Sequence, residues 1–290
     1  MTTGVRSTPS TRRRLRPIGH GLVLAGLLFL AYLFLVIGPA VRTFGFDAFA
    51  YWAVDIADPY GVPVGGLGAF TYTPVAARAF DPAGLLTWPA FLWLWSALLL
   101  GTVIWLGGRR FLWILAFPPV ALELFHGNVH LLFAAMCVLG FRYPWVWVFG
   151  IFTKATPGIG LLWFLVRREW RNLGIALGVT AVIGAVSLLV DGRLWTEWLA
   201  FALTAESGGQ VAQAQVPIPL LGRIPVAALV VVWGARTDRR WTVPVAVTLA
   251  LPVLWPSGFA VLAGCLALSP MAGRPWFRLA GRGGAPMSGG

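Results

Sequence analysis

Carboxylates and aromatic residues gather between two hydrophobic segments of this sequence, and they are the first candidates for chemistry. Residues 42–89 hold four of the ten acidic residues, namely Asp47, Asp55, Asp58 and Asp81. A carboxylate beside apolar and aromatic groups can take the proton of a bound hydroxyl as a general base. Asp47 is therefore a candidate base, although an exposed helix cap is the alternative. Asp55 and Asp58 are interpreted as structural, since Asp58-Pro59 is typical of a turn.

The only lysine of the chain, Lys154, lies between two apolar runs. An ionisable group at membrane depth is costly and usually faces a partner or a water-filled cavity. An anionic lipid headgroup would suit Lys154. A lysine that extends from a helix end toward the membrane surface is the alternative interpretation.

Two further basic elements could bind an anionic or polar ligand. In the turn from His126 to His130, the histidines and Asn128 could form hydrogen bonds to a sugar or a phosphate, or simply make a polar turn. Histidines four residues apart could ligate a metal, but no Asp or Cys nearby completes a set, so we expect no metal and no cofactor. Arg223 could clamp a phosphate or extend toward the membrane surface.

Composition places these residues in a membrane protein with many spans. The 290 residues are 58% hydrophobic and 11% charged, with a mean hydropathy of +0.79, whereas soluble domains carry about 25% charged residues. The formal charge of +12 does not indicate nucleic-acid binding, because the arginines cluster in short loops beside apolar runs, as they do on the cytoplasmic side of membrane proteins. Cys137 and Cys265 lie in apolar runs, so we expect no disulfide.

The apolar segments predict an all-α bundle of about ten transmembrane helices. Residues 18–41 are long enough to span a bilayer and are read as an uncleaved anchor. The predicted domain covers residues 18–270, with external loops at 42–89 and 191–216. Basic tails at 1–17 and 271–290 are predicted to be cytoplasmic. Most acidic residues then fall on the outer side, where we expect the function to reside.

Short helices are predicted in the middle of the chain. The apolar pieces between two basic turns are Phe111–Phe125, Val129–Phe141, Pro144–Phe152 and Pro157–Val166. A 15-residue helix covers only about 22 Å of a roughly 30 Å hydrocarbon core. Four short helices therefore fit better than two long ones, and this arrangement places the His126 turn and Lys154 on the outer side.

Three motifs in this order resemble glycosyltransferase family 87. They are Gly127-Asn128-Val129-His130-Leu131-Leu132, Phe149-Gly150-Ile151-Phe152-Thr153-Lys154-Ala155-Thr156-Pro157, and Arg167-Arg168-Glu169-Trp170-Arg171. Asp47 followed by Tyr51, and Phe70-Thr71-Tyr72-Thr73-Pro74, are similar to the family's Asp-x-x-x-Tyr and its later aromatic stretch. Gln215 and Arg223 resemble a late Gln and Arg. The chain departs from the family in being short, in its His126–His130 turn and in Thr73, which stands where the family has proline.

The resemblance implies a GT-C fold and an enzyme that moves a sugar, mannose or in some relatives arabinofuranose, from a polyprenyl-phosphate donor. Asp47 would be the base, while Lys154, Arg223 and His126 would hold the donor phosphate. Tyr51, Tyr72, Asn128, His130 and Gln215 would contact substrate. The expected acceptor is an envelope glycan or glycolipid at the outer face of the plasma membrane, and the transfer would invert the anomeric centre.

Two other function classes remain open on the sequence. A transporter or flippase for a lipid-linked or anionic substrate can also place short helices around an ionisable residue, but the absence of an internal repeat counts against it. A non-catalytic relative is the third possibility, because the C-terminal region is short. A covalent glycosylated product separates the first class from the other two.

Overall fold

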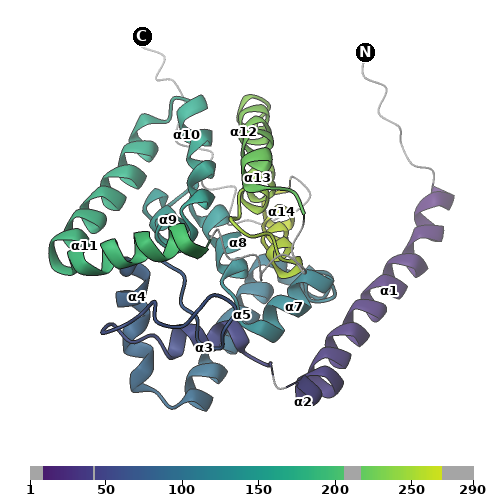
Figure 1. Ribbon diagram of the computed structural model, residues 1–290. Coiled ribbons are helices and arrows are strands. Elements are labelled where there is room, and N and C mark those ends of the chain that lie inside the picture. Colours follow the sequence, from purple (N-terminus) through teal and green to yellow (C-terminus); the bar gives the residue numbers. More distant parts are fainter. Residues whose placement is uncertain (1–8, 42, 206–216, 270–290) are drawn as a thin grey trace, which may run out of the picture.

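The computed structural model describes residues 9–41, 43–205 and 217–269, and helices are the only regular elements within these ranges (Figure 1). This confirms the prediction of an all-α protein. The α-helices are α1 (Pro9–Tyr32), α2 (Gly38–Val41), α3 (Phe46–Trp52), α4 (Pro74–Phe80), α5 (Trp88–Gly107), α6 (Phe111–Leu115), α7 (Pro118–His126), α8 (His130–Leu139), α9 (Trp147–Lys154), α10 (Leu162–Val166), α11 (Trp170–Ala205), α12 (Leu220–Arg236), α13 (Thr242–Leu249) and α14 (Ala263–Leu268).

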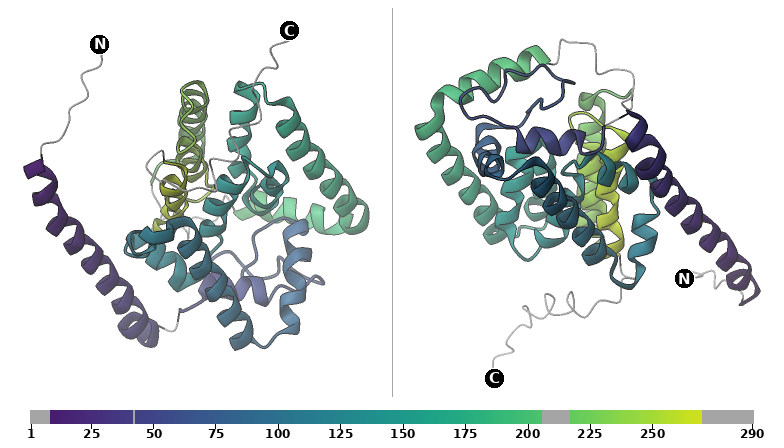
Figure 2. Two further views of the ribbon diagram at one scale, coloured as in Figure 1. Left: turned by 180° about the vertical axis from the view of Figure 1, so that it is seen from behind. Right: turned by 90° about the horizontal axis from the view of Figure 1, so that it is seen from below.

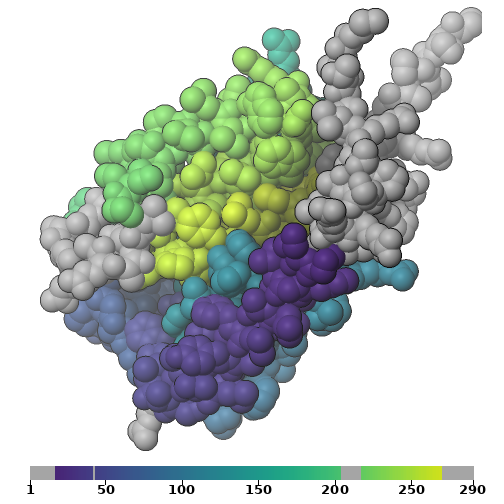
Figure 3. All heavy atoms as spheres, turned by 90° about the vertical axis from the view of Figure 1, so that its right-hand side faces the viewer, coloured from purple at the N-terminus to yellow at the C-terminus, as the bar shows by residue number. Residues whose placement is uncertain are grey.

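Three helical segments in the described residues are long and apolar enough to cross a membrane. They are Pro17–Val41, Trp88–Leu115 and Trp170–Leu203, and a bent pair formed by α7 and α8 makes a fourth if it is one span. The first agrees with the predicted anchor at 18–41. It lies on the outside of the molecule (Figure 3), and its N-terminal end points away from the bundle (Figure 1). The count of about ten spans stays a prediction, as do the two cytoplasmic tails.

The loop after the anchor contains two short α-helices, which are joined by an irregular segment at residues 53–73. α3 follows Gly45, and α4 begins at Pro74, a residue type suited to a first helical turn. Aromatic side chains join these pieces, since the rings of Tyr51 and Phe80 stack with centroids 4.7 Å apart. Figure 2 shows this part of the chain beside the lower ends of the central helices. The loop therefore packs as part of the bundle.

The centre of the chain breaks into short helices, as predicted, but the first predicted piece, Phe111–Phe125, divides into α6, which continues the apolar segment of α5, and α7. α7 and α8 meet at 113°, and the bend falls at Gly127, whose φ of +73° is the left-handed conformation that glycine adopts without strain. α9 and α10 follow, joined by a 3₁₀ turn at Thr156–Leu161. The buried bend turns the polar residues of the His126–His130 segment toward the loop.

The second predicted external segment begins inside a helix. α11 runs from Trp170 to Ala205, and its backbone is non-helical at Asp191 (φ −121°, ψ 35°). Arg78 of α4 donates to both carboxylate oxygens of Asp191, so the kink is held by a bidentate ion pair. The part of α11 after the kink continues across the loop, where the ring of Phe201 stacks on Tyr60 at 5.5 Å. The rest of the predicted segment, 206–216, lies outside the described residues.

Candidate active site

The candidate site forms where α3 meets the bend between α7 and α8. The N–H of Gly45 donates to the carbonyl of Phe125 at 2.9 Å, which ties the start of α3 to the end of α7. At Gly127, an added Cβ would lie 2.7 Å from the Cβ of Ala48. Because glycine leaves that space free, α3 approaches the bend closely. Trp95 of α5 holds the bend from the other side by donating to the Gly127 carbonyl at 2.7 Å.

Asp47 accepts a hydrogen bond from Asn128 across this contact. The Asn128 Nδ2 lies 2.8 Å from Oδ2 of Asp47, and the Asn128 Oδ1 accepts the backbone N–H of Val129 at 2.7 Å. The second contact fixes which end of the amide faces the carboxylate. Asn128 therefore orients Asp47, and the predicted substrate-contacting residue is a direct partner of the predicted base.

Burial raises the pKa of Asp47, and the hydrogen bond from Asn128 partly offsets this effect. His126 and Lys154 also interact with the carboxylate favourably, and Glu123 unfavourably. A carboxylate with a raised pKa is a stronger base once it is ionised. Asp47 is also less exposed than Asp55 and Asp58 of the same loop.

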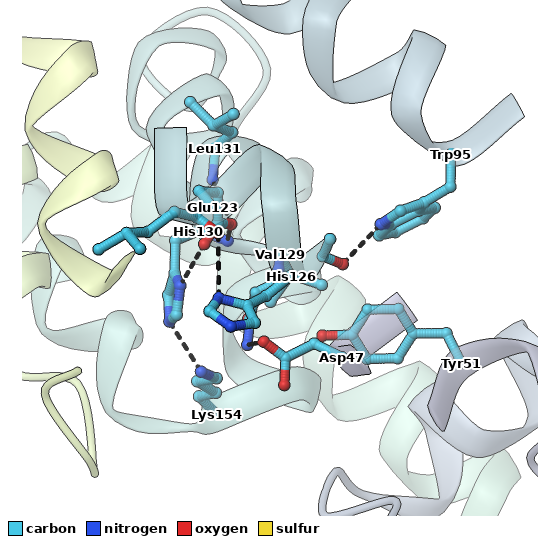
Figure 4. Close-up of polar contacts among 12 residues, drawn as sticks. Asp47, Tyr51, Trp95, Glu123, His126, Val129, His130, Leu131 and Lys154 are labelled. Carbon is cyan, nitrogen blue, oxygen red and sulfur yellow. Dashed lines mark hydrogen bonds and ion pairs between the residues drawn. The ribbon is translucent and has the colours of Figure 1, made fainter. Parts of the chain in front are cut away.

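Lys154 lies at the C-terminal end of α9 and reaches the same bend (Figure 4). Its Nζ is 2.9 Å from Nε2 of His130 and 5.9 Å from the centre of the Tyr72 ring. The Nδ1 of His130 is in turn 2.9 Å from Oε2 of Glu123. Figure 4 shows the imidazole between the lysine and the glutamate, with Asp47 and His126 beside it. The bend therefore holds both the candidate base and the candidate cation.

The loop supports Lys154 as well as Asp47. Thr73 contacts the Phe152 carbonyl through its hydroxyl and its backbone N–H, which attaches the start of α4 to α9. Tyr51 and Tyr72 share a hydrogen bond between their hydroxyls at 2.9 Å, and both rings are buried. The two predicted substrate-contacting tyrosines thus lie beside the site, with their hydroxyl groups paired to each other.

Arg223 lies in a different environment. Its guanidinium donates to four backbone carbonyls, those of Ile218, Leu249, Leu251 and Pro252, at 2.7–3.0 Å. These contacts hold the start of α12 against the end of α13. No hydrogen bond or ion pair between Arg223 and Asp47 or Lys154 occurs among the described residues, and the observed partners of Arg223 are those of a structural residue. Gln215 lies outside the described residues.

His126 has a local partner, because its Nδ1 is 3.1 Å from the Leu122 carbonyl one turn earlier in α7. Its ring lies near Asp47 (Figure 4). No group of three or more His, Cys, Asp or Glu residues that could hold a metal occurs in the described part of the chain. The site as described consists of carboxylate, amide, imidazole and ammonium groups.

Comparison with known protein families matches residues 70–280 to glycosyltransferase family 87. The chain belongs to this family. No curated protein and no solved structure shows a significant match to it. The family match covers more than half of the sequence and includes Asn128, His130 and Lys154. Together with the apolar helices, it identifies a membrane glycosyltransferase, as the sequence resemblance predicted. Asp47 precedes the matched residues, so its link to the family site rests on the Asn128 contact.

The sequence interpretation of this family 87 glycosyltransferase gave no role to Glu123 or Trp95. Glu123 was recognisable as a carboxylate within an apolar run, which is costly unless it has a buried partner. Its partner, His130, was already a candidate. Trp95 carried no such signal, because its role comes from a hydrogen bond to a backbone carbonyl 32 residues away.

Proposed function

We propose that this family 87 enzyme transfers a sugar, with mannose the expected one, from a polyprenyl-phosphate donor to a hydroxyl of an envelope glycan or glycolipid. The reaction takes place at the outer face of the plasma membrane, and both termini of the chain are cytoplasmic. A single observation carries the proposal. One bend positions a partly buried carboxylate through Asn128 and a lone lysine through His130.

In the proposed reaction, Asp47 accepts the proton of the acceptor hydroxyl. The hydroxyl oxygen forms a bond to C1 of the sugar while the bond from C1 to the phosphate oxygen breaks. The electron pair of that bond leaves with the polyprenyl phosphate. Attack opposite the leaving group inverts the configuration at C1. The products are the glycosylated acceptor, the polyprenyl phosphate and a protonated Asp47, which returns its proton to solvent.

Lys154 holds the departing phosphate in this proposal. An ammonium group fixed near the leaving oxygen stabilises the negative charge that develops there. His126, which lies near Asp47, is the second candidate for a phosphate contact. The buried surroundings strengthen these electrostatic interactions, because they are not screened as they would be in bulk water.

The test is a transfer assay with the purified protein in nanodiscs, polyprenyl-phosphate mannose and membrane glycolipid acceptors. Asp47→Asn keeps the size of the side chain and removes the base, so we expect transfer to fall by about 10²–10⁴-fold. Asp55→Asn is the matched control, because its Oδ1 accepts the N–H of Ala57 at 2.8 Å and an amide oxygen can do the same. Unchanged turnover by Asp47→Asn would exclude Asp47 as the base.

The same assay addresses the transport alternative. A transporter would move the lipid-linked sugar between leaflets without forming a covalent product. Recovery of an inverted glycosidic bond in the product supports the transferase. Counterflow of donor without product would contradict it.

A further inference from the structure

Glu123 is a buried carboxylate to which the proposed reaction gives no task. It lies in α7 with a fully buried side chain, and it faces the first residues of α8. Its Oε1 accepts the backbone N–H groups of His130 and Leu131, the second at 3.2 Å. Its Oε2 faces Nδ1 of His130 at 2.9 Å. A buried acid with three partners is costly to maintain, which suggests a role beyond filling space.

The contacts of Glu123 favour its ionised form. Both N–H groups belong to the start of α8, where helix N–H groups have no partner within the helix and a negative charge is stabilised. Such hydrogen bonds favour the charged form of a carboxylate and oppose the effect of burial, which favours the protonated form. The remaining oxygen, Oε2, is then an acceptor directed at the imidazole.

That acceptor determines which nitrogen of His130 carries the proton. A neutral imidazole has one N–H and one acceptor nitrogen. With Oε2 facing Nδ1, the proton lies on Nδ1, and Nε2 becomes the acceptor. Nε2 is the atom that Lys154 reaches at 2.9 Å. The ionised Glu123 carboxylate thus determines the donor and the acceptor in both side-chain hydrogen bonds of His130, the one to Glu123 and the one to Lys154.

We propose that Glu123 is a positioning residue, which acts through the tautomer of His130 to hold the Lys154 ammonium in place for the donor phosphate. This inference rests on the proposed function. The ammonium uses one of its three N–H groups on His130, and the other two serve an anionic ligand. Glu123 itself touches neither substrate nor the reacting atoms.

The opposite proton arrangement is the competing state. A protonated Glu123 would donate to Nδ1, His130 would carry its proton on Nε2, and Lys154 would have to be a neutral amine that accepts it. The net charge of the three residues is zero in both states. Only the first state offers a cation to the phosphate, so the two can be distinguished by the tautomer.

The first experiment needs no substitution. The protein is labelled with ¹⁵N-histidine and reconstituted in nanodiscs, and the imidazole nitrogens are observed by NMR. The chain has three histidines, so His130→Gln identifies the signals of residue 130. We expect a protonated Nδ1 and an acceptor Nε2. A protonated Nε2 in the wild-type protein would overturn the inference.

The second experiment reverses the tautomer with Glu123→Gln. An amide with its oxygen toward the two backbone N–H groups must present its NH₂ to Nδ1. The proton of His130 then moves to Nε2 and opposes the ammonium of Lys154. In the NMR spectrum, we expect Nε2 of His130 to be protonated and Nδ1 to be the acceptor. We also expect farnesyl phosphate, a short polyprenyl phosphate, to bind about tenfold more weakly. Glu169→Gln is the control, since Glu169 bonds Arg167 and Asn172 elsewhere.

A double-mutant cycle separates positioning from a purely structural role. If Glu123 acts through Lys154, Glu123→Gln weakens farnesyl phosphate binding in the wild type but not in a Lys154→Met background. Equal losses in both backgrounds would show that Glu123 only supports the fold and would overturn the inference. Failure of the wild type to bind farnesyl phosphate would contradict the proposed function instead, and the tautomer of His130 would still decide the role of Glu123.

Discussion

Lys154 and Arg223 are two cations held inside the same bundle, and their surroundings differ in kind. Lys154 has one hydrogen-bond contact to a side chain, the Nε2 of His130, and lies near Asp47. Arg223 directs its guanidinium at four backbone carbonyls of the α12–α13 region. An arginine that donates to four carbonyls stabilises a loop, whereas an ammonium with unused donors can bind an anion. Both residues were predicted to hold the donor phosphate, and their partners now separate them.

The largest expected effect is the loss of catalysis in Lys154→Met. Removal of one charged donor from the leaving phosphate is expected to lower kcat/KM by about 10²–10³-fold, while the protein stays folded because methionine fits a buried site. Arg223→Met, measured per folded molecule, should keep a rate close to that of the wild type. Equal losses of rate in the two variants would remove the distinction between the cations.

The next largest effect is on stability. Here Arg223→Met should have a larger effect than Lys154→Met. Arg223→Met removes the donor from four backbone carbonyls, and loss of the buried bond to Leu251 alone costs about 1–3 kcal/mol, so we expect a lower thermal midpoint in detergent. Arg223→Lys should not restore it, because a single ammonium lacks the planar fork of donors. A thermal midpoint for Arg223→Met equal to that of Lys154→Met would contradict the structural role.

The pH dependence of transfer tests the environment of Asp47, the carboxylate that lies near Lys154. Asp47 must be ionised to act as a base, so the rate rises as pH increases through its pKa. Burial raises that pKa above the usual value of an aspartate and Asn128 lowers it. Asn128→Ala therefore raises the pKa further, and the acidic limb of the pH–rate profile should move to higher pH. Asp55→Asn serves as the control and should leave that limb in place. A shift to lower pH in Asn128→Ala would contradict the role of Asn128.

The smallest effect is expected from the tyrosine pair beside Lys154. Tyr72→Phe removes one buried hydroxyl partner and should destabilise the protein by about 1 kcal/mol, while the ring beneath the ammonium remains. Adding Tyr51→Phe should cost little more, because the hydroxyl that it removes has already lost its partner. Thermal unfolding of the single and double variants measures both steps. Additive losses would mean that the two hydroxyls stabilise the fold independently.

Local sequence patterns predicted much of the fold. The anchor at 18–41 and the helix ending at Gly107 follow from long uncharged runs, and the breaks around 126–130 and 154–157 follow from glycine, proline and polar residues between short apolar pieces. The continuation of α11 through Asp191 was not predicted. The acid resembled the start of a loop, but a second helix follows the kink at Asp191, where an ion pair with Arg78, 113 residues distant, holds the chain.

The sequence by itself determined the class of the protein and the residue types of its site, because hydropathy, charge placement and motif order are local properties. A lone lysine, an acid after the anchor and a polar turn can be recognised without coordinates. The side chains and carbonyls that these residues contact could not be recognised in this way. Asp47 meets Asn128 because glycine lets α3 approach the bend, Glu123 meets His130 across a 113° break, and Arg223 meets carbonyls of another helix. Only the tertiary structure decided these contacts, because each joins residues that are distant in the sequence or lie on different helices.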